Sequence, residues 1–209
     1  MIKSNGMMFI LSSPSGAGKT TLTKKLEKNN KNFQISISHT TRKPRLNEVD
    51  GREYNFVNTE QFKLLINEGS FFEYATIFGN YYGTLKKPVL DALSQGKDVL
   101  FDIDWQGTEQ LKKIPDLNLV TFFILPPDVE ILKTRLLNRD QNKKKSVEER
   151  MKKFNEEVSH WKDYDYVIIN DDLERCYGEV LSIIQLEKEG KKKIQQKDEI
   201  ENKVKHLIK

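Results

Sequence analysis

The chain has 209 residues, of which 37% are hydrophobic, which suits one domain with a lid or insertion, or two small domains. Its single cysteine excludes an internal disulfide and indicates a reducing compartment. No apolar run approaches the roughly 20 residues of a membrane span, and the N-terminus lacks a signal-peptide pattern, so we expect a cytoplasmic protein without membrane contact. The net charge of +4 belongs to residues 188–209, which carry eight lysines and four acidic residues, while residues 1–187 carry 27 basic and 27 acidic side chains. This balance excludes a broad nucleic-acid-binding face.

Strand-like and helix-like segments alternate along most of the chain. Residues 7–11 predict a first buried strand, and residues 19 to about 29 predict the first helix. Further strands are expected at 33–38, 71–77, 99–104, 119–125 and 166–169. Further helices are expected at about 59–68, 88–95 and 128–138, with one that begins at residue 146 and a last one that ends at about residue 186. This order predicts an α/β fold with a parallel, doubly wound sheet.

Residues 36–86 interrupt this alternation with short strands and turns. We expect them to form an inserted, mixed α+β lobe that binds a substrate. Residues 1–35 and 87–187 would then make the core, and residues 188–209 a basic helical tail.

A glycine-rich segment lies between the first strand and the first helix; it reads Ser13-Pro14-Ser15-Gly16-Ala17-Gly18-Lys19-Thr20-Thr21. Gly16 and Gly18 let backbone N–H groups approach an anion that the helix N-terminus also favours. Lys19 can reach the outer phosphates of a nucleoside triphosphate, and the Thr20 hydroxyl can ligate Mg²⁺. Ser13 stands where the full phosphate-loop pattern has its first glycine. The segment predicts a triphosphate-binding loop, which ATPases, GTPases and small-molecule kinases share.

Two carboxylates, Asp102 and Asp104, end the strand predicted at 99–104. A carboxylate at the C-terminal end of a buried strand, near the phosphate loop, can hold the water shell of Mg²⁺. Asp102 is therefore a candidate metal residue.

Three arginines flank a polar segment at about 138–150, which we expect to be a lid. Arg135 and Arg139 are four residues apart and share one face of a helix, and Arg150 opens the next helix. Guanidinium groups stabilise the negative charge that phosphoryl transfer spreads over the transferred group.

The expected insert carries residues suited to a second phosphate. Arg42 and Arg45 can each donate two hydrogen bonds to one phosphate, and Tyr54 and Tyr82 supply phenolic donors. The insert is thus a candidate site for a nucleotide acceptor.

A carboxylate in an apolar segment of the same insert, Glu73, indicates which base that acceptor carries. The adjacent N1 and N2 donors of guanine suit one carboxylate, and its O6 acceptor suits hydroxyl donors such as Ser38 and Thr84. Adenine has the opposite polarity at that edge, so such a site would leave polar groups unpaired and reject it.

With these motifs in place, residues 6–187 closely resemble the guanylate kinase family. The resemblance rests on Ser15-Gly16-Ala17-Gly18-Lys19-Thr20, Ser38-His39-Thr40-Thr41-Arg42-Lys43-Pro44-Arg45, Glu48, Gly51, Tyr54-Asn55-Phe56-Val57, Glu73, Gly79-Asn80-Tyr81-Tyr82-Gly83-Thr84, Asp102-Ile103-Asp104, Gln106-Gly107, Pro126-Pro127, Arg135, Arg139, Arg150 and Ile169-Asn170-Asp171-Asp172. It implies a P-loop kinase that transfers a phosphoryl group from Mg-ATP to GMP, with dGMP as a second acceptor, and it leaves the oligomeric state open. Ser13, His39 and Thr84 depart from the pattern typical of the family. Thr84 keeps the hydroxyl, and His39 is expected to be an ordinary surface residue, or alternatively a pH-sensitive neighbour of the phosphate site.

By this resemblance, the GMP phosphate is held by Arg42, Arg45, Tyr54 and Tyr82. Guanine is read by Glu73, Ser38, Thr84 and Asp104. The ATP phosphates and Mg²⁺ are held by residues 13–21 with Lys19 and Thr20, Asp102 supports the metal, and Asn170 lies near the adenine. The expected catalytic set is Lys19, Arg42, Asp102 and the lid and clamp residues Arg135, Arg139 and Arg150.

Two other functions remain open. A non-catalytic, guanylate kinase-like binding module would typically have a degraded phosphate loop, whereas Gly16, Gly18, Lys19 and Thr20 are intact. A P-loop kinase for another acceptor, such as AMP or UMP, is disfavoured by Glu73. The tail is expected to form a helix that packs loosely on the domain, or alternatively a membrane-surface or oligomerisation helix.

Overall fold

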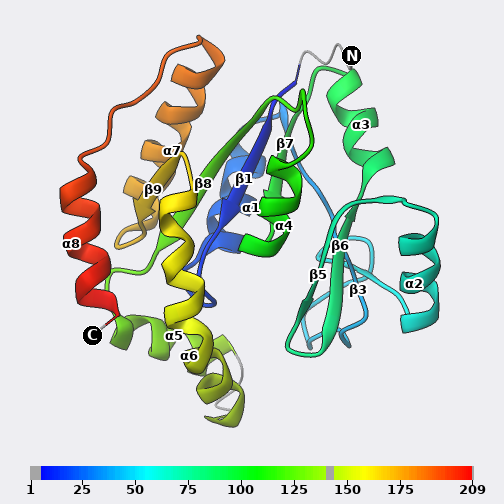
Figure 1. Cartoon of the computed structure of the whole chain (residues 1–209), viewed down its shortest axis with the longest axis horizontal. Helices are drawn as coiled ribbons and strands as arrows, with labels where there is room; N and C mark the ends of the chain where they lie inside the picture. The colour runs from blue at the N-terminus through cyan, green and yellow to red at the C-terminus, as the bar shows by residue number, and fades with distance from the viewer. Residues whose placement is uncertain (1–5, 140–143, 209) are drawn as a thin grey trace.

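The computed structural model describes residues 6–139 and 144–208, apart from the side chains of Arg139, Lys145 and Ser146 (Figure 1). Its described residues form two sheets. The central sheet consists of β1 (Met8–Ser12), β2 (Phe33–Ile35), β7 (Asp98–Asp102), β8 (Leu119–Leu125) and β9 (Tyr166–Ile169), in the order β2-β7-β1-β8-β9. All four pairings in it are parallel. The predicted parallel α/β core is confirmed.

Strand β1 shows why this sheet is covered on both faces. Phe9 and Leu11 pack in one core cluster with α1 (Lys19–Asn29) and α7 (Leu173–Lys188). Met8 and Ile10 point to the other face and pack in a cluster with α3 (Lys86–Ser94) and α4 (Trp105–Lys112). Because alternate side chains of a strand face opposite ways, a run that is apolar at every position needs a cover on each side.

The second sheet is built from residues 39–85 and lies beside the central one (Figure 1). It contains β3 (His39–Thr40), β4 (Asn55–Phe56), β5 (Phe71–Ile77) and β6 (Asn80–Leu85), in the order β4-β3-β6-β5, with α2 (Thr59–Asn67). The β5–β6 and β3–β6 pairs are antiparallel, and the β3–β4 pair is parallel. This mixed sheet comes from the segment where the regular alternation of the sequence stops.

The remaining helices follow the last two central strands. They are α5 (Val129–Arg139), α6 (Lys144–Ser159), the short 3₁₀ helix η1 (His160–Asp163), and α8 (Lys197–Leu207). The start of α6 lies two residues before the start expected at residue 146. The part of the expected lid at 140–143 lies outside the described residues.

The predicted strand at 99–104 is too long, and one helix was not predicted. Strand β7 ends at Asp102, and the side chain of Asp104 instead caps α4 by accepting a hydrogen bond from the Gly107 N–H (3.1 Å). Aspartate is a favoured N-cap residue. A glycine in the first turn weakens the helical signal of the segment, because Gly is a poor helix former.

The tail packs closely on the domain. Ile200, Val204 and Leu207 of α8 are at most 9% exposed and share a core cluster with residues of α5, α6, β8 and β9. Before α8, the Gln195 side chain accepts from the Val167 N–H and donates to the Val167 C=O, each at 2.9 Å. It thereby satisfies backbone groups on the outer edge of β9, where no strand follows in the sheet order. Among the described residues, no helix is long and apolar enough to cross a membrane.

Candidate active site

The glycine-rich loop predicted to bind phosphate connects β1 to α1 and depends on its two glycines. Gly16 and Gly18 have φ values of 92° and 100°, in the region that side chains disfavour. A Cβ on Gly18 would lie 2.2 Å from the Asn170 side-chain nitrogen, which donates to the Ala17 C=O (2.7 Å). The non-glycine residues with positive φ in the described chain are Phe78 and Asp116, so a glycine is not required at Ser13.

Lys19 extends from the start of α1 to the C-terminal end of β7. Its Nζ lies 2.5 Å from Asp102 Oδ1 and donates to the Ile103 C=O at 2.9 Å. The adjacent parallel strands β1 and β7 end at the same edge of the sheet, which brings the lysine and the carboxylate together. Thr20, the next residue, lines one cleft together with Lys19 and Asp102.

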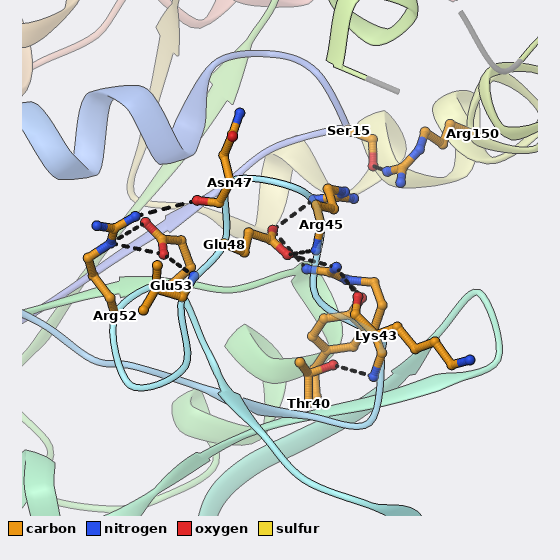
Figure 2. A network of polar contacts seen from close by, with 12 residues as sticks. Ser15, Thr40, Lys43, Arg45, Asn47, Glu48, Arg52, Glu53 and Arg150 are labelled. Atoms are coloured by element: carbon orange, nitrogen blue, oxygen red, sulfur yellow. Dashed lines mark hydrogen bonds and ion pairs between the residues drawn. The ribbon is translucent and has the colours of Figure 1, made fainter. Parts of the chain in front are cut away.

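The arginine cluster of the second sheet is organised by Glu48 (Figure 2). Arg42 donates to Glu48 Oε1 (3.0 Å) and lies 2.9 Å from Oε2, and Arg45 donates to the same carboxylate through its backbone N–H (2.8 Å) and its guanidinium (3.2 Å). Burial opposes ionisation of Glu48, but the hydrogen bonds and charges of Arg42 and Arg45 outweigh it and hold its pKa below the ordinary value. Arg42 also donates to the Tyr82 hydroxyl (3.2 Å), and its guanidinium lies 5.3 Å from the Tyr54 ring centre.

Glu73 is a buried carboxylate on β5, 3% exposed. It pairs in register with Thr84 of β6, whose hydroxyl is 3.0 Å from that of Ser38. Its Oε1 atom has no hydrogen-bond partner among the described residues. Burial, with a smaller contribution from the negative charge of Asp104, raises the pKa of Glu73 to about 7, against opposing contacts with Thr84.

Gly107 of α4 has no side chain and so leaves space for the Glu73 carboxylate. A Cβ at Gly107 would lie 2.5 Å from Glu73 Oε2 and 3.0 Å from its carboxyl carbon. Asp104 caps the start of the same helix: its two carboxylate oxygens accept from the Gly107 N–H and from the Gln106 side chain (2.9 Å). The start of α4 therefore shapes the space around the buried carboxylate.

Two arginines from α5 and α6 contact the glycine-rich loop. Arg135 donates to the C=O groups of Ala17 and Asn170, both at 3.3 Å. Arg150 donates to the Ser15 hydroxyl at 3.3 Å (Figure 2). The side chain of Arg139 lies outside the described residues.

One cleft of about 1280 Å³ collects these groups from both sheets. The predicted site residues that line it are Ser13, Ser15, Gly16, Gly18, Lys19, Thr20, Thr21, Ser38, Arg42, Arg45, Tyr54, Glu73, Tyr82, Asp102, Asp104, Arg135, Arg150 and Asn170. Pro14, Ala17 and Thr84 are buried behind the lining. For Thr84, 1% exposed, the structure shows a hydroxyl that contacts Ser38 rather than the cleft.

Comparison with known proteins agrees with this arrangement. The guanylate kinase family model matches residues 5–187. The chain belongs to the guanylate kinase family. It is 47% identical to a guanylate kinase of Maricaulis maris over 183 residues, 88% of this chain and 84% of that one. It is 49% identical to one of Rickettsia prowazekii over 186 residues, 89% of this chain and 94% of that one.

A solved structure extends the likeness to the fold. The crystal structure of guanylate kinase from Anaplasma phagocytophilum matches with a TM-score of 0.74 and 36% identity, covering 89% of this chain and 88% of that one. The protein is thus a nucleoside monophosphate kinase, and the reaction of its family is phosphorylation of GMP by ATP. The tail after residue 187 lies beyond the family match.

Three residues that contact the predicted site groups were not predicted as site residues. Glu48 was noted only as part of the resemblance, although an acid three residues after Arg45 can pair with it in a tight turn. Glu157 of α6 accepts from the Ser15 N–H (2.9 Å), and burial raises its pKa to about 7. Phe78 enters the cleft from the turn between β5 and β6. Neither Glu157 nor Phe78 had a distinguishing sequence pattern.

The expectation that His39 is an ordinary surface residue was wrong. It is half-buried, with its ring 6.0 Å from that of Phe71, and burial lowers its pKa.

Proposed function

We propose that the two ends of this cleft bind the two substrates of the guanylate kinase reaction. The phosphate loop, residues 13–21, holds the ATP phosphates, with Lys19 reaching the outer ones and Asn170 near the adenine. The second sheet holds GMP, its phosphate against Arg42, Arg45, Tyr54 and Tyr82. Glu73, Ser38, Thr84 and Asp104 recognise guanine, with Thr84 acting through Ser38.

The observation that carries this proposal is the setting of Glu73. A carboxylate oxygen that is buried without a protein partner is costly, and a pair of N–H donors from a ligand relieves that cost. The N1 and N2 groups of guanine are such a pair. Adenine lacks this pair and would leave Oε1 unsatisfied.

Catalysis in this proposal comes from positioning and charge rather than from a general base. The phosphate oxygen of GMP is already anionic, so no proton needs to be removed before it attacks. Lys19, Arg42, Arg135, Arg139 and Arg150 neutralise the charge of the transferred group. Alignment of acceptor and donor in a cleft that excludes water then favours transfer to GMP over hydrolysis.

The oxygen groups at the loop fit Mg²⁺ as the ion that accompanies ATP. The Thr20 hydroxyl and the Asp102 carboxylate are the hard oxygen ligands that this ion prefers. The described residues contain no group of three or more His, Cys, Asp or Glu that could hold a metal, so the remaining ligands would come from phosphates and water. Mg²⁺ would supply neutralisation of the negative charge of the ATP phosphates.

A coupled ADP-release assay with Mg-ATP and GMP, dGMP, AMP, UMP or CMP tests the proposal. We expect turnover with GMP and with dGMP, because none of the proposed contacts requires the 2′-hydroxyl. Turnover with AMP or UMP would refute the guanine-reading role of Glu73. No turnover by folded protein with any acceptor would instead support a binding module.

A further inference from the structure

The turn that joins β5 to β6 contains an unfavourable residue. Phe78 and Gly79 form its two-residue loop between the paired Ile77 and Asn80, and both have positive φ, 48° and 74°. Such loops favour Asn-Gly or Asp-Gly, because residues with a Cβ disfavour this backbone region. A phenylalanine at the first position is therefore not explained by the turn itself.

The Phe78 side chain contacts the other side of the cleft. The guanidinium carbon of Arg150 lies 5.2 Å from its ring centre, and Lys153 Nζ lies 4.9 Å from it. Both cations belong to α6, more than 70 residues along the chain. Distances below about 6 Å are those of cation–π contacts, which place a positive group against the ring face.

Arg150 continues this contact into the phosphate loop. It donates to the Ser15 hydroxyl at 3.3 Å, and Phe78, Arg150 and Ser15 all line the same cleft. A chain of contacts thus runs from the tip of the second sheet, through one guanidinium, to the loop at the end of β1.

We propose that Phe78 is a positioning residue for phosphoryl transfer, whose ring holds the Arg150 guanidinium at the phosphate loop. The second sheet, which carries the acceptor, thereby helps to orient a cation that acts on the donor. The proposal rests on the phosphate-clamp role proposed for Arg150. The unfavourable backbone of Phe78 is explained if the ring is needed for this contact and not for the turn.

Replacement of Phe78 by asparagine separates its place in the turn from the contact of its ring with Arg150. Asparagine suits a positive φ, so Phe78→Asn is expected to keep the turn and a Tm within about 3 °C of the parent. It removes the ring, and we expect kcat to fall about five- to tenfold, the kinetic equivalent of a cation–π contact that is only partly desolvated. The KM for GMP is expected to change less than about twofold.

Two variants control this measurement. Phe78→Tyr keeps the aromatic face and is expected to retain the parent kcat. Asp116→Gly relaxes the other non-glycine residue with positive φ in the described chain, in an exposed loop outside the cleft, and is expected to leave kcat unchanged.

A double-mutant cycle with Arg150→Ala decides whether the ring acts through this arginine. We expect Phe78→Asn to have little further effect on kcat when Arg150 is already alanine. An equal loss in both backgrounds, or a parent-like kcat for Phe78→Asn alone, would overturn the proposal while leaving the role of Arg150 intact. A parent-like kcat for Arg150→Ala would refute the clamp role itself, and the inference with it.

Discussion

The buried carboxylate Glu73 is expected to lower the stability of the protein in exchange for its recognition of guanine. It is 3% exposed, and its Oε1 atom has no hydrogen-bond partner within residues 6–139 and 144–208. Glu73→Gln keeps the shape of the side chain and removes the charge. The variant should therefore be more stable than the parent at alkaline pH and a poorer kinase for GMP.

The magnitude follows from the pKa of Glu73, which burial raises from 4.5 to about 7. At about 1.4 kcal/mol for each pH unit between the two values, ionised Glu73 costs the folded state about 3 kcal/mol. Below pH 4.5 the carboxyl is protonated in both the folded and the unfolded chain, and no cost arises. Between pH 4.5 and pH 7 the folded state binds more protons, so stability falls as pH rises, and above pH 7 the full cost applies.

Urea denaturation of the nucleotide-free protein at pH 5 and pH 8 measures this effect. The gain in unfolding free energy from Glu73→Gln should be about 2 kcal/mol larger at pH 8 than at pH 5, with unchanged m-values. Glu60→Gln, on the exposed start of α2, serves as the control for loss of a carboxylate and should show no such difference.

Kinetics of the same variant test the recognition itself. The amide of glutamine cannot accept two parallel hydrogen bonds from guanine, so kcat/KM for GMP should fall by the equivalent of about 1–3 kcal/mol. An equal gain in unfolding free energy at pH 5 and pH 8 would refute the pKa argument. Unchanged kinetics with both GMP and AMP would refute the recognition argument, and the two failures are independent.

Three further substitutions test other parts of the cleft. Lys19→Ala should abolish turnover in a folded protein, and near-normal kcat would exclude its phosphate role. Arg42→Lys should raise the KM for GMP and lower kcat, because a point charge replaces a planar guanidinium that contacts both Glu48 and Tyr82; unchanged constants would remove Arg42 from the site. Gly107→Ala should lower kcat/KM for GMP about tenfold by displacing Glu73, whereas Gly178→Ala, in α7 with open space around it, should not; equal effects would contradict the steric argument.

Local signals in the sequence were sufficient to predict the strand, glycine-rich turn and helix around Lys19. The apolar run of β1, the glycines at 16 and 18, and Lys19 all act within one strand–turn–helix unit, so their spacing carries the information. The position of Asp102 near this loop was also predicted, because the ends of neighbouring parallel strands share one edge of the sheet, whereas its ion pair with Lys19 was not.

Contacts between segments that are distant in the sequence could not be predicted from these local patterns. Glu157 accepts from the Ser15 N–H across 142 residues, and nothing in the charged pattern of α6 distinguishes it from its neighbours. Phe78 occupies a turn position at which its side chain is disfavoured, so propensity pointed away from it. Helix α4 was missed because Gly107, which leaves space for the Glu73 carboxylate, weakens the helical pattern.

The protein's own carboxylates already contact four of the groups proposed to bind phosphate. Asp102 pairs with Lys19, Glu48 with Arg42 and Arg45, and Glu157 with the Ser15 N–H. Each pair avoids the cost of an isolated buried charge or donor. A substrate phosphate must therefore compete with a carboxylate rather than meet a bare cation.

This competition favours the phosphate of a nucleotide over weaker anions. A phosphate group brings up to two negative charges and three acceptor oxygens, whereas a carboxylate brings one charge and two oxygens. Arginine can bind both at once, because its five N–H donors exceed what one carboxylate accepts. Glu48 can thus keep Arg42 and Arg45 oriented while they take up the GMP phosphate, so the cations are positioned before the substrate arrives. Such preorganisation is what electrostatic catalysis requires, since little reorientation then remains at the moment of transfer.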